Sequence, residues 1–113
     1  MHKDDLVKDI CEALKDAGHI EGYDYNHFES ADAIDPPFAI YRRVAPETFA
    51  ADGKTYYRGS NVDLELYALD PDEMADLMDA AEALLDAAEL YYHIAADTVY
   101  IDSEQMYETL YEI

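Results

Sequence analysis

Residues 71–88, PDEMADLMDAAEALLDAA, place apolar side chains in steps of three and four, a spacing that predicts an amphipathic helix. The start of the helix is well marked. Asp70 can cap the first free N–H groups, Pro71 suits the first helical position, and Glu73 completes a D-x-x-E capping box. Because β-like segments flank this helix on both sides, we expect it to cover a sheet. The residues expected to meet are Leu77, Met78, Leu84 and Leu85 on the helix and Val62, Leu64 and Leu66 on a strand.

Shorter patterns predict the rest of one α+β domain over residues 1–113. Residues 3–17 carry a second apolar stripe that includes Cys11, and Gly18 ends this helix. Strands are expected near 23–28, 38–44, 48–51, 54–69, 90–94, 98–101 and 106–111, with 95–97 joining two of them. The predicted fold class is an antiparallel or mixed sheet with both helices packed on one face.

A protruding β-hairpin is expected in the middle of the chain. Asp52-Gly53 suits a tight turn with positive φ at both central positions, and aromatic-bearing segments flank it. The hairpin carries Phe49, Tyr56 and Tyr57 close to Lys54 and Arg58. Together with Arg42 and Arg43 these residues form a candidate subunit interface, which comprises Arg42, Arg43, Phe49, Asp52, Gly53, Lys54, Tyr56, Tyr57 and Arg58.

The charge is extreme and uneven. The formal net charge is −20, and residues 59–113 contain fifteen acids but no lysine or arginine. This balance argues against direct, sequence-specific binding of nucleic acid and against anionic lipid as a partner, because both would be repelled. Two interpretations stay open: an acidic surface kept for solubility or salt adaptation, or a basic patch that docks on the acidic surface of a neighbouring copy.

The residues offer little for catalysis or cofactor binding. His2, His19, His27 and His93 lack the spacing of a metal site, and the single Cys11 lies within an apolar stripe, as a buried structural thiol does. No glycine-rich phosphate loop is present. We therefore expect no enzyme activity, no metal and no cofactor, although 27 acids leave a small hydrolase with an unrecognised carboxylate pair as a rival.

Neither a membrane-spanning run nor the apolar core of a signal peptide appears in the sequence. A cytoplasmic protein that does not enter a membrane is expected.

Four segments resemble small neck and tail-completion proteins of long-tailed phages and prophages of Gram-positive bacteria. They are Pro36-Pro37-Phe38, the hairpin from Phe49 to Tyr56, Glu65-Leu66-Tyr67, and the closing stretch from Tyr100 to Ile113, in the order found in that group. The resemblance spans most of the chain. The departure is the acidity, because proteins of that group carry more lysine in the second helix and the C-terminal segment.

The resemblance implies a tail-terminator-like fold and a non-enzymatic structural role in head-tail joining or tail completion. It also implies self-assembly into a ring, usually a hexamer, that meets the connector or head-closure proteins and the tail tube. The protein would assemble in the bacterial host cytoplasm and reside in the virion neck or tail. The alternative function is an acidic DNA mimic, a decoy that occupies a nucleic-acid-binding protein.

Overall fold

The computed structural model describes residues 2–28, 34–44, 48–51, 54–58 and 61–113, with 48–51 and 54–58 described by their backbone. The elements in chain order are α1 (Lys3–Asp16), β1 (Gly22–Tyr25), β2 (Phe38–Arg43), β3 (Thr48–Ala51), β4 (Lys54–Arg58), β5 (Val62–Ala68), α2 (Pro71–Ala87), β6 (His93–Ile101) and β7 (Met106–Glu112).

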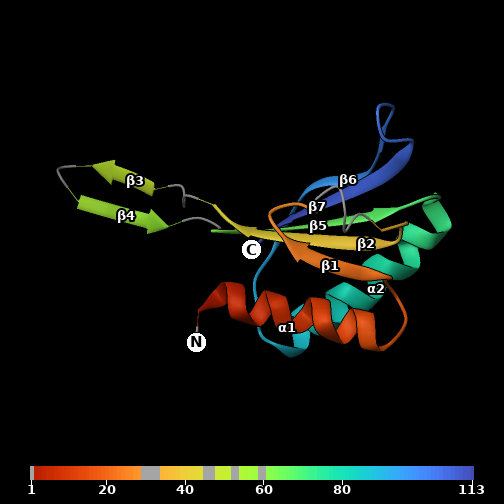
Figure 1. Cartoon of the computed structure of the whole chain (residues 1–113). Coiled ribbons are helices and arrows are strands. Elements are labelled where there is room, and N and C mark those ends of the chain that lie inside the picture. The colour runs from red at the N-terminus through yellow and green to blue at the C-terminus, as the bar shows by residue number, and fades with distance from the viewer. Residues whose placement is uncertain (1, 29–33, 45–47, 52–53, 59–60) are drawn as a thin grey trace.

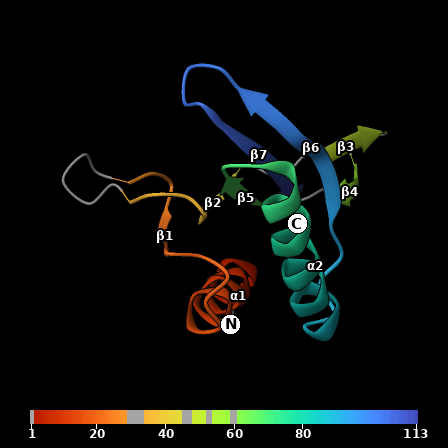
Figure 2. The same ribbon diagram turned by 90° about the vertical axis from the view of Figure 1, so that its right-hand side faces the viewer.

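The predicted α+β fold class is confirmed. The described strands form a five-stranded sheet in the order β1-β2-β5-β7-β6 and a separate two-stranded sheet of β3 and β4. The larger sheet is mixed, because β1 runs parallel to β2 whereas the remaining neighbours are antiparallel. Both helices lie on one face of it (Figure 1), and the view along the sheet in Figure 2 separates the helical layer from the open face. The projection of the β3–β4 hairpin from the domain stays a prediction.

Helix α2 begins as predicted, with one difference in the capping box. The Asp70 side chain accepts a hydrogen bond from the Glu73 N–H at 2.8 Å, and Pro71 occupies the first turn. The Glu73 side chain, however, accepts from the N–H of Leu69 at 3.1 Å rather than from that of Asp70. The Glu73 side chain therefore bonds the N–H group of the residue before the N-cap, and it still satisfies an N–H group where the chain enters the helix.

The main core lies between the helices and the inner face of the sheet. Leu77, Met78 and Leu85 are buried as predicted, against a sheet whose Val62, Leu64 and Leu66 are also buried. Leu84 is only half-buried, which corrects the prediction. Consecutive helical residues point about 100° apart, so a helix that aims Leu85 at the sheet leaves Leu84 at the flank of its apolar stripe.

Replacing Leu85 with Ala should lower the free energy of unfolding by about 2–5 kcal/mol, because the surrounding core cannot fully close the cavity. Leu84→Ala removes the same atoms from the flank and should cost clearly less. Urea unfolding of the two variants, followed by circular dichroism, compares them directly. Equal losses would contradict this assignment of the buried face.

Both helices end in the same hydrogen-bonded motif, but with different residues in the left-handed position. After α1, Gly18 has φ +82°, and His19 N–H donates to the Leu14 carbonyl. After α2, Glu89 has φ +58°, and Leu90 N–H donates to the Leu85 carbonyl. This is the Schellman arrangement, in which glycine is favoured because it lacks a Cβ.

The contrast predicts opposite effects at the two helix ends. Glu89→Gly should raise the free energy of unfolding by about 0.5–1 kcal/mol, because it relieves left-handed strain in a side-chain-bearing residue. Gly18→Ala should lower it by about 1 kcal/mol through φ alone, since a Cβ there meets no atom within 4 Å. Thermal and urea unfolding test both, and Glu89→Gln controls for the lost charge. A stability gain in Glu89→Gln equal to that in Glu89→Gly would assign the effect to charge.

The region after α2 differs from the prediction. Instead of strands near 90–94 and 98–101 joined by 95–97, one strand, β6, runs through His93–Ile101. Its register against β7 shifts between Ile94 and Ala96 and again between Ala96 and Val99. Thr98 has φ +51°, and its N–H donates to the Thr109 side chain at 3.0 Å. β-Bulges thus accommodate residues 95–97, which were expected to join two strands, within a single strand.

The face of the sheet opposite the helices carries a smaller apolar cluster. Phe38, Ile40 and Tyr67 are buried there, with Phe28, Ile34, Ile101 and Met106 packed around them. The Phe38 and Tyr67 rings stack with centroids 4.7 Å apart. The strand expected at 23–28 ends at Tyr25, and Phe28 lies beyond it and packs against this second cluster.

Candidate functional site

The structure divides the candidate interface residues into two groups. Arg42 and Arg43 end β2, and their side chains are described. The others belong to β3, β4 and their turn. Phe49 and Tyr57 stand opposite each other in the β3–β4 ladder, and Tyr56 falls at its register shift. The side chains of Phe49, Lys54, Tyr56, Tyr57 and Arg58, and the turn at Asp52 and Gly53, lie outside the described part of the chain.

Arg42 contacts carboxylates of its own chain. Its Nη2 lies 2.7 Å from Glu65 Oε1, and its Nε lies 3.8 Å from Asp63 Oδ2, both on the neighbouring strand β5. Glu65 is 7% exposed, whereas the Arg42 side chain is 36% exposed. Arg42 therefore supplies positive charge to a buried carboxylate, a structural role that the sequence pattern did not suggest.

Arg43 connects the end of β2 to the first helix. Its Nη2 donates to both Asp4 carboxylate oxygens, at 3.0 and 3.1 Å. Burial opposes ionisation of Asp4, but the hydrogen bond and charge of Arg43 outweigh it, and the pKa of Asp4 is lowered. Arg42 and Arg43 of the candidate interface are thus engaged inside the domain.

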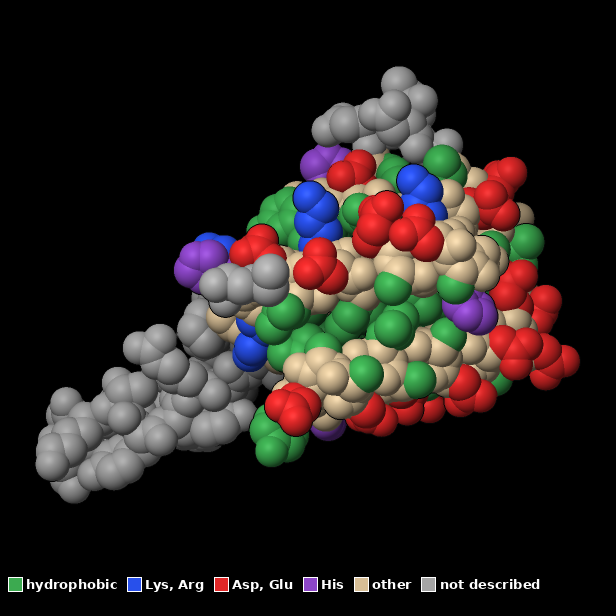
Figure 3. Space-filling view, turned by 90° about the horizontal axis from the view of Figure 1, so that it is seen from below, with side chains coloured by type: hydrophobic (Ala, Val, Ile, Leu, Met, Phe, Trp, Pro, Cys, Tyr) green, Lys and Arg blue, Asp and Glu red, His purple; other side chains and the backbone are tan. Residues whose placement is uncertain are grey.

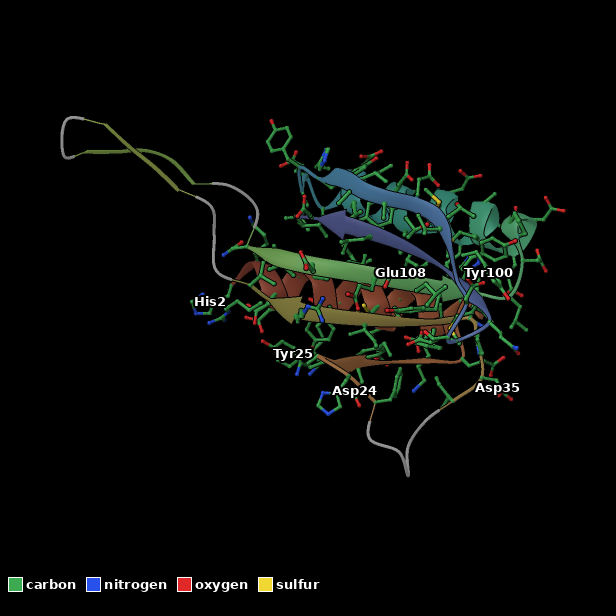
Figure 4. All side chains as sticks on the ribbon, turned by 90° about the horizontal axis from the view of Figure 1, so that it is seen from above. His2, Asp24, Tyr25, Asp35, Tyr100 and Glu108 are labelled. Atoms are coloured by element: carbon green, nitrogen blue, oxygen red, sulfur yellow. The ribbon has the colours of Figure 1, made fainter. Side chains whose placement is uncertain are left out.

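A polar network on the open face of the sheet was missed by sequence reasoning. The Tyr67 hydroxyl lies 2.5 Å from a Glu108 carboxylate oxygen and 3.3 Å from one of Glu65. Figure 4 looks onto this face and labels Glu108 on β7. Burial, the hydrogen bond to Glu108 and the two nearby carboxylates raise the pKa of Tyr67, so the hydroxyl stays protonated and donates. The alternation Val62-Asp63-Leu64-Glu65-Leu66-Tyr67 was the available signal, because it places Glu65 and Tyr67 opposite the core.

Acidic side chains also face each other across this sheet. Asp63 on β5 stands opposite Glu112 on β7, and His93 on β6 stands opposite Glu112 in turn. Burial raises the pKa of Asp63 despite the charge of Arg42, and Glu112 raises it further. Burial likewise raises the pKa of Glu65, in spite of Arg42. The open face therefore holds carboxylates that are costly to ionise.

Tyrosine hydroxyls reach carboxylates on the helical side as well. Tyr111 donates to Glu82 at 2.7 Å, and Tyr92 lies 3.2 Å from the other oxygen of the same carboxylate. Tyr23 donates to Glu12. Tyrosines on this side of the sheet thus hold carboxylates within this chain.

The outer face of α2 is acidic. Asp72, Asp76, Asp79 and Asp86 are exposed along it, and the last turn contains no basic residue. Figure 3 views the helical side, where acidic side chains dominate one part of the surface and lysines and arginines appear elsewhere among acids. The acidic and basic residues, which are unevenly distributed along the sequence, are therefore also unevenly distributed over the surface.

The described residues assemble no metal centre. No group of three or more His, Cys, Asp or Glu side chains in this part of the chain is placed to hold a metal ion. Cys11 is buried within α1, and burial raises the pKa of its thiol to about 12, as suits a structural residue. No helix in the described ranges is long and apolar enough to cross a membrane.

Comparisons of the chain with protein-family models, with curated proteins and with solved structures found no match.

The Arg42–Glu65 contact yields a stability prediction. Arg42→Gln should lower the free energy of unfolding at pH 7 by about 1–3 kcal/mol, because a buried carboxylate loses its cation. Arg43→Gln, which breaks a more exposed pair, should cost about 0–1 kcal/mol. Urea unfolding of the two variants provides the comparison, and equal losses would contradict it.

The pH dependence of the same variant separates charge from packing. The pKa of Glu65 is raised in the folded protein, so its carboxylate disfavours folding once ionised and ceases to do so when protonated. The deficit of Arg42→Gln should therefore shrink as the pH falls from 7 toward about 4.3, the ordinary pKa of glutamate. A deficit that is constant over this range would assign the effect of Arg42 to packing.

Proposed function

We propose that the chain is a non-enzymatic structural subunit that assembles with copies of itself into a ring at a phage head-tail junction. In this role it completes the tail and meets connector or head-closure and tail-tube proteins. The proposal rests on the resemblance of the four segments, and on one structural observation. Within the described residues, β3 and β4 pair with each other and with no strand of the five-stranded sheet.

An isolated two-stranded ladder gains little stability in water, so it is expected to dock on another surface. We call residues 48–58 the arm. The arm contains Lys54 and Arg58, whereas residues 59–113 hold fifteen acids and no lysine or arginine. A neighbouring copy therefore offers an electrostatic complement to the arm. A contact between two different surfaces of one chain repeats head to tail, and it closes a ring when the rotation permits.

The internal contacts of Arg42 and Arg43 narrow this proposal. These arginines pair with Glu65 and Asp4 of their own chain, so Lys54 and Arg58 are the cations of the candidate interface left to meet a neighbour. An acidic channel would also suit passage of DNA, because phosphate is repelled from it rather than bound.

Light scattering across protein concentration tests the proposal. The double variant Lys54→Glu/Arg58→Glu should stay folded by circular dichroism but lose self-association, with at least a tenfold rise in the dissociation constant. The matched control Lys8→Glu/Lys15→Glu changes the net charge equally on exposed positions of α1, and it should assemble as the wild type does. Shortening the arm around residues 52–53 should also abolish assembly.

Two outcomes would contradict the proposal. An unchanged oligomer in both arm variants would exclude the arm from assembly. A wild-type protein that is monomeric at every concentration would favour the acidic decoy, which needs no contact between copies.

A further inference from the structure

We propose that the free edge of β6, at residues 99–101, receives β4 from a neighbouring copy of this chain. This inference rests on the proposed function and names the surface that the arm meets.

The two edges of the larger sheet differ in what they offer. β1 is four residues long, and the N–H of Tyr25 already donates to the Asp24 side chain at 2.7 Å. β6 is nine residues long and pairs, among the described strands, with β7 alone. Its sequence, HIAADTVYI, contains none of the lysines or prolines that commonly protect an edge.

The bulges of β6 leave residues 99–101, the receiving stretch, as the part of this edge that is suited to pairing with another strand. Register shifts disturb β6 up to Val99, and such bulges discourage pairing of an edge with another chain. From Val99 to Ile101 the strand is in regular register with Glu108, Tyr107 and Met106. Val99 is 49% exposed and Tyr100 is 48% exposed, so this regular stretch is also apolar and accessible. Figure 4 labels Tyr100 near the end of the sheet where β6 and β7 join.

The charges beside the receiving stretch favour pairing with β4 of a neighbouring copy over pairing with a second β6. Asp97, Asp102 and Glu104 are exposed beside the receiving stretch. A second β6 would bring the same acids into opposition, which is unfavourable in a chain with a net charge of −20. β4 instead begins at Lys54 and ends at Arg58, with Thr55, Tyr56 and Tyr57 between them. Strand addition would supply the backbone hydrogen bonds, and the two cations would meet the acids of the edge.

Carbodiimide cross-linking of a mixture of ¹⁴N- and ¹⁵N-labelled protein tests the contact. This reagent joins an amine to a nearby carboxylate, and Lys54 is the lysine of the arm. We expect mixed-isotope peptides that link Lys54 to Asp97, Asp102 or Glu104. Links from Lys54 to the acids of α2, with none to these three residues, would overturn the assignment and leave the ring proposal standing.

Two sets of variants provide a second measurement. Tyr100→Lys should weaken self-association at least tenfold, whereas Leu69→Lys, the same change in charge at another exposed apolar position, should not. Asp102→Lys/Glu104→Arg should restore assembly to Lys54→Glu/Arg58→Glu, with folding checked by circular dichroism. Absence of rescue together with an unchanged Tyr100→Lys oligomer would overturn this inference, and a wild-type monomer would overturn the proposed function with it.

Discussion

Hydrogen bonds from tyrosine hydroxyls to carboxylates join the helical layer to the sheet at the margin of the apolar core. The chain has 27 acids and only seven lysines and arginines, so most carboxylates cannot find a cation. Tyr111 of β7 donates to Glu82 of α2, and Tyr23 of β1 donates to Glu12 of α1, so each bond joins a strand to a helix. The half-buried Glu82 carboxylate loses part of its hydration, and the tyrosine donors compensate for that loss. Tyrosine suits this task because its ring packs in the core while its hydroxyl reaches the polar margin.

The tyrosine hydroxyls satisfy the hydrogen bonding of these carboxylates but do not neutralise their negative charge. A tyrosine donor is neutral, so the net charge of −20 continues to repel both the parts of one domain and neighbouring copies. Such repulsion acts where Asp63 of β5 faces Glu112 of the neighbouring strand β7. Arg42 contacts Asp63 and Glu65 there and offsets part of it. The stability of this chain is therefore coupled to protonation and ionic strength, and the proposed self-association would be coupled to them through the same carboxylates.

The sequence patterns predicted the features of this fold that depend on residues close together in the chain. Helix α2 could be predicted because Asp70, Pro71 and the spacing of its apolar residues act within a few turns. The ends of β6 were predicted, but its continuity was not, because Ala95, Ala96 and Asp97 have weak strand propensity and are held by a ladder to β7 and by Thr109. The Tyr67–Glu108 and Tyr111–Glu82 contacts join residues far apart in sequence, and no spacing rule indicates them. For the same reason Arg42 and Arg43 suggested a surface patch, although register with β5 and proximity to α1 give them internal partners.

Those internal partners hold the strand end that precedes the arm. The chain leaves β2 beside Arg43, which is tied to α1 through Asp4, and Arg42 ties the same strand end to β5. Val44 N–H donates to the Asn61 carbonyl, and Asn61 N–H donates to that of Ile113, so the outgoing and returning segments are joined to each other and to the end of β7. A docking segment on a rigid root loses less conformational freedom on binding than one on a loose linker. In the proposed assembly the two arginines would act without touching a neighbour, because they hold the end of β2 to α1 and to β5.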